Sequence, residues 1–322
     1  MIRFHFGTAS GWALTAFLLM SHAAFAQTYP SQPVKLVVPF PAGSATDNVA
    51  RMLAQELQSD LGQPFVVDNR PGAQGMVGAE AVARSSPDGY TLLVAAVSFA
   101  ATPSMFRKVP FDPVTDFAPV SRIATTPLVL MVMTDFPART AREFVDYAKT
   151  QRGKLSAGYG SSSSQVCIAQ LASLANIEVL PVPYKGIPLA INDVLGGTLH
   201  FTFADLGNAI AQTKGGRMRA IGVTSARRNP IVPDWPALAE TLPGFDLDAW
   251  IATFGPKGLP EAIARRLHEA TTRAMAKPDV QARLAAQGFA PALLGSSELG
   301  PFVKAEVQKW AKLAKQAGIE PE

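Results

Sequence analysis

The stretch Val34-Lys35-Leu36-Val37-Val38-Pro39-Phe40-Pro41-Ala42-Gly43-Ser44-Ala45-Thr46-Asp47 decides the fold of this chain. Its apolar first half predicts a buried strand, and its Gly- and Ser-containing second half predicts a turn that leads into a helix. A second unit of the same kind follows, in which Leu155 to Tyr159 precede Gly160 and four serines, Ser161 to Ser164. Each turn offers backbone N–H groups at a helix N-terminus, which favours anion binding. Two such turns indicate two facing halves of one site.

The N-terminus has the three parts of a secretory signal. Arg3 supplies the positive charge, Gly11 to Met20 form an apolar run, and Ala24-Phe25-Ala26 gives a small-x-small cleavage pattern. The apolar run is shorter than the ~20 residues that a membrane-spanning helix needs. We therefore expect export to the periplasm, removal of residues 1–26 as a signal peptide, and a soluble mature chain that begins at Gln27.

Charge and cysteine content narrow the functional classes. The formal net charge is +4, and removal of Arg3 with the signal peptide leaves +3. This excess is too small to predict binding to nucleic acid or to a membrane surface. The single cysteine, Cys167, excludes an intramolecular disulfide. Because it lies among apolar residues of an expected helix, we expect a buried, inert thiol.

Motifs for metals and cofactors are missing from the sequence. Beyond the signal peptide only His200 and His268 remain, and no CxxC or HExxH pattern occurs. The Gly158-Tyr159-Gly160 turn lacks the third glycine of a dinucleotide-binding motif, and no phosphate-binding P-loop pattern is present. We expect no metal site and no cofactor.

Strand-like apolar runs alternate with helical stretches, as in α/β proteins with mostly parallel strands. Beyond the two opening units, the expected strands are Phe65–Asp68, Tyr90–Ala95, Leu128–Met133, Val179–Tyr184, Leu199–Phe203, Met218–Thr224 and Asp248–Phe254. The expected helices begin at Asn48, Ala141, Gln165, Pro188, Glu261 and Glu298. Ser44 and Asp47 match a capping box at the start of the first helix. Ser98 and Phe99 follow a strand, and ligands of open α/β sheets bind at such carboxyl ends.

Several motifs in order give the mature chain a family resemblance. They are Tyr29–Val34, the Val38–Asp47 turn, Asn69–Gly72, Ser86–Tyr90, Val182–Gly186 and Arg219–Ser225. With these motifs the chain resembles the Bug-type proteins, which are extracytoplasmic solute receptors of tripartite tricarboxylate transport systems. The resemblance covers essentially the whole mature chain.

The resemblance implies a two-domain periplasmic binding protein fold of a type II-like kind, with a carboxylate held in the interdomain cleft. Domain 1 would comprise residues 27–126 and 249–322, and domain 2 residues 127–248. The expected partners are a di-, tri- or aromatic carboxylate and the membrane components of the transporter, and we expect a monomer. With the strand-end residues included, the expected ligand-binding residues are Phe40, Ala42, Gly43, Ser44, Ala45, Thr46, Asp47, Ser98, Phe99, Gly160, Ser161, Ser162, Ser163, Ser164, Gln165, Asp205 and Asn208.

Three departures from the family pattern bear on the ligand. Ala204 stands where members often have an acid, and the acid here is Asp205. Apolar residues stand at Phe99 and Val166, where polar ones are usual. The apolar residues at Phe99 and Val166 argue against a small, very polar ligand, and Phe99 is expected to be able to stack on an aromatic ring.

Two other functions remain open from the sequence. A periplasmic serine hydrolase could use Ser161 to Ser164, but it would need a general base, and neither His200 nor His268 is expected near that turn. A sensory receptor that signals to a membrane kinase would have the same fold. We also expect ligand to close the domains by a hinge, with crossings near Ala124–Pro127 and Asp246–Trp250.

Overall fold

The computed structural model describes residues 1–2, 29–151, 153–316 and 318–321. The expected signal peptide falls almost wholly on residues 3–28, which lie outside the described residues. In the described part, none of the helices is both long enough and apolar enough to cross a membrane.

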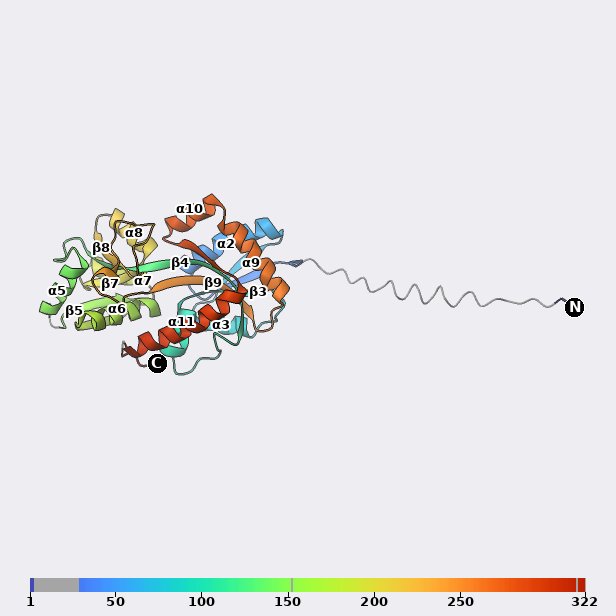
Figure 1. Cartoon of the computed structure of the whole chain (residues 1–322), viewed down its shortest axis with the longest axis horizontal. Coiled ribbons are helices and arrows are strands. Elements are labelled where there is room, and N and C mark those ends of the chain that lie inside the picture. The colour runs from blue at the N-terminus through green and yellow to red at the C-terminus, as the bar shows by residue number, and fades with distance from the viewer. Residues whose placement is uncertain (3–28, 152, 317, 322) are drawn as a thin grey trace.

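A sheet of ten strands forms the frame of the molecule (Figure 1). The strands are β1 (Val34–Val38), β2 (Phe65–Asn69), β3 (Thr91–Ala96), β4 (Phe117–Met133), β5 (Leu155–Tyr159), β6 (Val179–Pro183), β7 (Phe201–Asp205), β8 (Met218–Val223), β9 (Asp248–Pro256) and β10 (Ala290–Leu294). Their order is β2-β1-β3-β9-β4-β7-β5-β6, and β8 and β10 also pair with β4. Only the groups β2-β1-β3 and β6-β5-β7 are parallel, so the expectation of a mostly parallel sheet is wrong.

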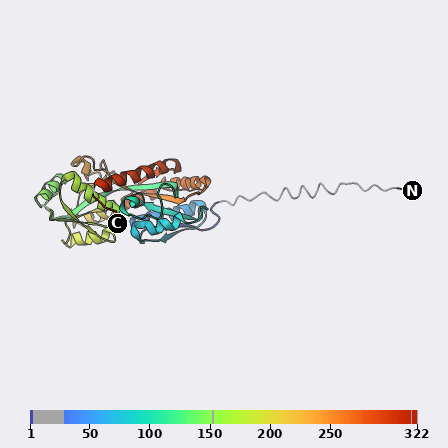
Figure 2. The same cartoon turned by 90° about the horizontal axis from the view of Figure 1, so that it is seen from below.

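Helices cover the sheet at both ends. They are α2 (Ala45–Leu61), α3 (Met76–Ala83), α4 (Ser98–Met105), α5 (Ala141–Gln151), α6 (Ser162–Ala175), α7 (Ile187–Leu195), α8 (Leu206–Lys214), α9 (Glu261–Met275), α10 (Pro278–Ala286) and α11 (Ser296–Gln316), with the short 3-10 turns η2 (Ala73–Gly75) and η3 (Leu238–Glu240). We call the part built around β2-β1-β3 the first lobe and the part built around β6-β5-β7 the second lobe. Figure 2 shows α11 running along one side of the molecule, and α11 packs against both α4 and α6.

Strands β4 and β9 connect the two lobes as one antiparallel ladder. Thr125 pairs with Trp250, and Pro127 pairs with Asp248. The strand expected to begin at Leu128 is therefore the second half of a longer strand that begins at Phe117. The expected domain boundaries at 126/127 and 248/249 fall inside this ladder.

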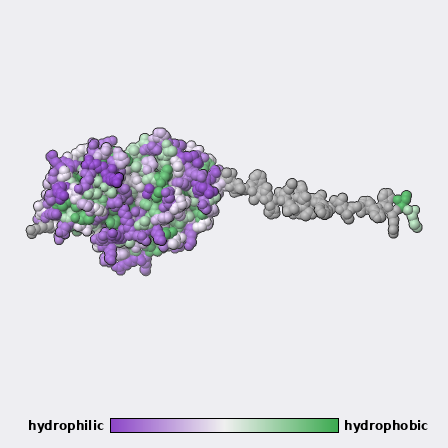
Figure 3. All heavy atoms as spheres, viewed as in Figure 1, coloured by the Kyte–Doolittle hydropathy of each residue, from purple (hydrophilic) through white to green (hydrophobic). Residues whose placement is uncertain are grey.

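The interior is apolar, whereas hydrophilic residues cover much of the face in Figure 3. The largest fully buried side chains include Trp250, Trp310 and Phe245. Cys167 is a buried free thiol on α6, as expected, and burial raises its pKa. Glu56 of α2 is 7% exposed and binds Lys277 at 2.7 Å and Arg283 at 2.5 Å, which ties α2 to the C-terminal helices.

The sequence missed four elements, α4, α8, α10 and β10. Helix α4 is apolar, contains Pro103 and has no amphipathic pattern that would set it apart from the strand before it. Strand β7 begins two residues later than expected and ends at Asp205, because its register places Asp205 opposite Leu128.

Candidate functional site

The two Ser/Gly turns occupy equivalent places in the two lobes. Strand β1 lies between β2 and β3, and β5 lies between β6 and β7, with all neighbours parallel. The turn after β1 leads into α2, and the turn after β5 leads into α6. Each lobe thus presents a helix N-terminus at the carboxyl edge of its central strand, where α/β folds bind ligands.

In the first turn, Asp47 holds the backbone in place. Ser44 caps α2 by accepting a hydrogen bond from the Asp47 N–H at 3.2 Å. The Asp47 carboxylate does not complete the expected capping box, because it accepts instead from the Gly43 N–H at 2.8 Å, from Arg51 at 2.9 Å and from Asn69 at 2.8 Å. Burial acts to raise the pKa of Asp47, but these bonds lower it below its usual range. The charge of Asp47 is therefore engaged within the turn.

The amides of Ala45 and Thr46 remain for a ligand. They lie in the first turn of α2, where a helix offers no internal acceptor, and no other described residue accepts from them. Next to them, Phe40 is half-buried and its carbonyl accepts from Asn69 at 3.1 Å, while Ala42 and Gly43 are exposed.

The second turn has the same plan with serines in place of the carboxylate. Ser161 caps α6 by accepting from the Ser164 N–H at 3.2 Å, and the Ser164 hydroxyl accepts from the N–H groups of Gly160 and Ser161 at 3.2 and 3.1 Å. A Cβ atom on Gly160 would lie 2.2 Å from the backbone of Gly186, so only glycine fits. Within the described residues, no acceptor contacts the N–H groups of Ser162 and Ser163.

One contact joins this turn to the first lobe. The Ser162 hydroxyl donates a hydrogen bond to the side-chain oxygen of Gln74, which belongs to the loop after β2. That loop also lies against the first turn, since a Cβ on Gly75 would be 3.4 Å from Pro39. Gln74 is not among the ligand-binding residues expected from the sequence. A signal was available in a long polar side chain between two glycines.

Phe99 lies in a cluster of aromatic side chains at the start of α4. Its ring is 5% exposed and packs against Phe111, Phe117 and Phe254, with ring centroids 5.8, 4.9 and 5.0 Å away. Stacking of Phe99 on a ligand ring does not fit this packing, because its neighbours are already aromatic core residues. Ser98 and Phe99, at the start of α4, line with Gln74 a cavity of about 10 Å³, which is too small for a ligand ring.

The third expected loop is also a helix N-terminus, but it carries its own anion. Asp205 caps α8 and accepts from the backbone and side-chain N–H groups of Asn208 at 3.0 and 2.7 Å. A Cβ on Gly207 would lie 2.4 Å from the carbonyl oxygen of Gln287, so this turn packs closely against the first lobe. The carboxylate of Asp205 already satisfies the positive end of α8.

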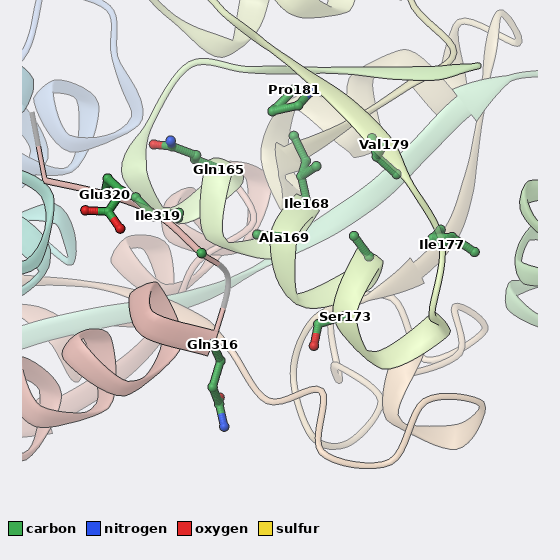
Figure 4. A pocket seen from close by; sticks show the side chains of 12 residues that line it. Gln165, Ile168, Ala169, Ser173, Ile177, Val179, Pro181, Gln316, Ile319 and Glu320 are labelled. Atoms are coloured by element: carbon green, nitrogen blue, oxygen red, sulfur yellow. The ribbon is translucent and has the colours of Figure 1, made fainter. Parts of the chain in front are cut away.

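A larger cavity of about 660 Å³ lies beside α6 and the C-terminal segment (Figure 4). Gln165 lies at its edge, and its walls include Ile168, Val179 and Ile319. Glu320 lines it as well, and a carboxylate there disfavours a second anion. This cavity lacks the free helix amides of the serine turn, so it is a poor candidate for carboxylate binding.

The two histidines expected outside the signal peptide bond serines other than those of the Ser161–Ser164 turn. His200 bonds the Ser156 hydroxyl at 3.0 Å, and His268 bonds the Ser121 hydroxyl at 2.9 Å. Both serines lie outside the Ser161–Ser164 turn. Across the described residues, no group of three or more His, Cys, Asp or Glu side chains could hold a metal ion.

Comparison with known proteins identifies the family. Residues 49–319 match the family described as the tripartite tricarboxylate transporter family receptor. The chain belongs to this receptor family.

Relatives of this receptor agree in sequence and in structure. Protein BugT of Bordetella pertussis is 33% identical over 302 residues, which cover 92% of each chain. The R. palustris protein Rpa4515 with adipate has a TM-score of 0.86 and 32% identity, and the match covers 91% of this receptor and 100% of that chain. MatC from Rhodopseudomonas palustris with bound malate has a TM-score of 0.79 and 31% identity, with coverage of 88% and 99%. The Bug-type resemblance and the periplasmic binding protein fold are confirmed.

Proposed function

We propose that this receptor binds an organic carboxylate between its lobes and delivers it to the membrane components of a tripartite tricarboxylate transporter. The observation that carries this proposal is the pair of serine-capped helices, α2 and α6, whose first amides are free at equivalent strand ends. The adipate and malate of two structural neighbours support a carboxylate of similar size.

The helix N-termini and hydrogen bonds can supply the anion-binding part of a micromolar affinity without a salt bridge to the ligand. A micromolar affinity corresponds to about 8 kcal/mol. Each helix N-terminus contributes up to about 2 kcal/mol in a partly buried site, and each hydrogen bond to an ionised group adds about 1.5–3 kcal/mol before ordering costs. The anion contacts thus supply about half of the affinity, and the rest of the ligand sets the specificity.

Within this proposal the ligand closes the lobes around the β4–β9 ladder. A ligand that contacts amides of both lobes has more contacts in the closed arrangement, and this difference shifts the population toward closure. Small-angle scattering should then give a smaller radius of gyration with ligand than without it. Equal radii under confirmed binding would contradict hinge closure but not binding.

A carboxylate panel in calorimetry tests the proposed ligand class. The panel contains adipate, malate, benzoate, the tricarboxylate tricarballylate and the uncharged adipamide. We expect a carboxylate to bind and adipamide to bind poorly, since the helix amides favour a charge. Replacing Ser44 or Ser163 with Leu should weaken binding at least about tenfold. Ser173→Leu, on an exposed part of the same helix α6, is the matched control and should bind as the unchanged receptor does. Undiminished affinity in both site variants would exclude the site.

Three further points belong to the same proposal. The receptor acts in the periplasm as a monomer after cleavage following Ala26, which intact-mass measurement of exported protein would test. It is a binding protein and not an enzyme, so the ligand should be recovered unchanged after incubation. Turnover of a carboxylate ester by the Ser161–Ser164 turn would support the hydrolase alternative instead.

A further inference from the structure

The loop that carries Gln74 holds an unusual backbone shape. Four consecutive residues, Gly72 to Gly75, have positive φ angles, and two of them are not glycine, namely Ala73 at 44° and Gln74 at 51°. Residues with a Cβ seldom adopt the left-handed region, and residues that do so cluster at functional sites, where the surrounding structure stabilises the strained backbone. At this loop the strain places a long polar side chain against the other lobe.

The contact made by Gln74 uses a donor that a ligand would need. A serine hydroxyl has a single hydrogen to donate. Ser162 is 2% exposed and gives its hydrogen to the Gln74 oxygen, at the first turn of α6. Under the proposed function, the same turn binds the ligand carboxylate. The Gln74 oxygen and a carboxylate oxygen therefore compete for the same hydroxyl.

We propose that Gln74 is an internal competitor of the ligand, a side-chain amide that bridges the two lobes through Ser162 until a carboxylate takes that hydroxyl. This inference rests on the proposed function of the serine turn. The side-chain oxygen of Gln74 is uncharged. It therefore accepts a hydrogen bond at the positive end of α6 more weakly than a carboxylate does, because hydrogen bonds to ionised acceptors are stronger. Gln74 thus occupies the Ser162 hydroxyl in the empty receptor and yields it to an anion.

Competition between Gln74 and the ligand for the Ser162 hydroxyl also makes the site selective for anionic over neutral ligands. A ligand must offer a better acceptor than an amide to gain from displacing Gln74, so neutral ligands gain little. The Ser162 hydroxyl has one hydrogen to donate, so the Gln74 oxygen must give up this bond when a ligand carboxylate accepts from the same hydroxyl.

The test compares Gln74→Ala in two backgrounds with adipate and malate as probes in calorimetry. In the unchanged receptor, Gln74→Ala should tighten binding about three- to tenfold, the worth of one net hydrogen bond. In the Ser162→Ala background the same substitution should change affinity less than about twofold, because the shared hydroxyl is gone. Weaker binding in Gln74→Ala, or an equal gain in both backgrounds, would overturn the proposal.

A second measurement does not depend on ligand affinity. Gln74→Ala should increase the radius of gyration of the receptor without added ligand, since it removes one of the contacts between the lobes, beside the packing of α11 on α6 and of Gly207 on Gln287. If neither probe binds any variant, the ligand class of the proposed function fails, while scattering still decides the role of Gln74. An unchanged radius in Gln74→Ala without added ligand would show that this bond does not hold the lobes together.

Discussion

Asp248 carries a charge that the folded receptor holds at a cost. It is the first residue of β9 and pairs with Pro127 of β4, where the two lobes connect. Its Oδ1 atom is buried and has no hydrogen-bond partner among the described residues. Burial and then the nearby charge of Asp246 raise the pKa of Asp248 to about 6, despite the opposing charge of Lys309.

The difference between the folded and unfolded pKa values of Asp248 fixes how this residue changes the free energy of unfolding with pH. Raising the carboxyl pKa from 3.8 to about 6 costs the folded state up to about 3 kcal/mol at any pH where the group is ionised in both states. The unfolded chain releases this proton near pH 4 and the folded chain near pH 6. The contribution of Asp248 is therefore unfavourable above about pH 6, and it disappears as the pH falls below about 4.

Asp248→Asn removes the charge and keeps the shape of the side chain. We expect the variant to be more stable than the unchanged receptor at pH 7.5 by up to about 3 kcal/mol, or about 6 °C in Tm for a chain of this size, and equally stable at pH 4. Thermal unfolding at both pH values measures this, with the exposed Asp135→Asn as control. A variant with the same or lower stability at pH 7.5 would refute the assignment of this cost to the Asp248 charge.

Three further substitutions test contacts that stabilise helices α2 and α6. Glu56→Gln should lower the free energy of unfolding by about 1.5–3 kcal/mol at pH 7. The bond from its lysine partner chiefly lowers the pKa of Glu56, so urea titrations should show this difference shrinking as the pH falls below the usual range of a glutamate. Ser161→Ala should cost about 1 kcal/mol in urea unfolding, as the loss of a helix cap does. Gly160→Ala forces a Cβ against Gly186 and should cost about 1–3 kcal/mol; a wild-type midpoint would contradict that packing.

The sequence predicted the local chemistry of both turns because short-range rules decide it. Ser44 precedes an amphipathic stretch and is the N-cap expected for it. The helix expected from Gln165 begins earlier, at Ser162, with Ser161 as its N-cap. The αL cap at Gly62 follows from the same rules. The family resemblance added the pairing of the turns, which no local pattern contains.

What the sequence did not show depends on contacts between distant residues. Phe99 follows a strand end, which indicated a ligand contact, but Phe111, Phe117 and Phe254 arrive from other parts of the chain and enclose it. The strand expected at Leu128–Met133 is only the second half of β4, because pairing with β9 carries β4 through Pro127. Gln74 becomes a candidate only when the fold places it against Ser162.

The charges at each helix N-terminus determine how strongly that terminus attracts a ligand carboxylate. Helices α2, α6 and α8 follow β1, β5 and β7, and their caps are Ser44, Ser161 and Asp205. The caps of α2 and α6 are neutral, whereas Asp205 supplies a negative charge at α8. Helix α2 also carries the Asp47 carboxylate in its first turn, and Arg51 pairs with that charge. Helix α6 has no acidic residue in its first turn, so within the proposed function it attracts a ligand carboxylate more strongly than α2 does.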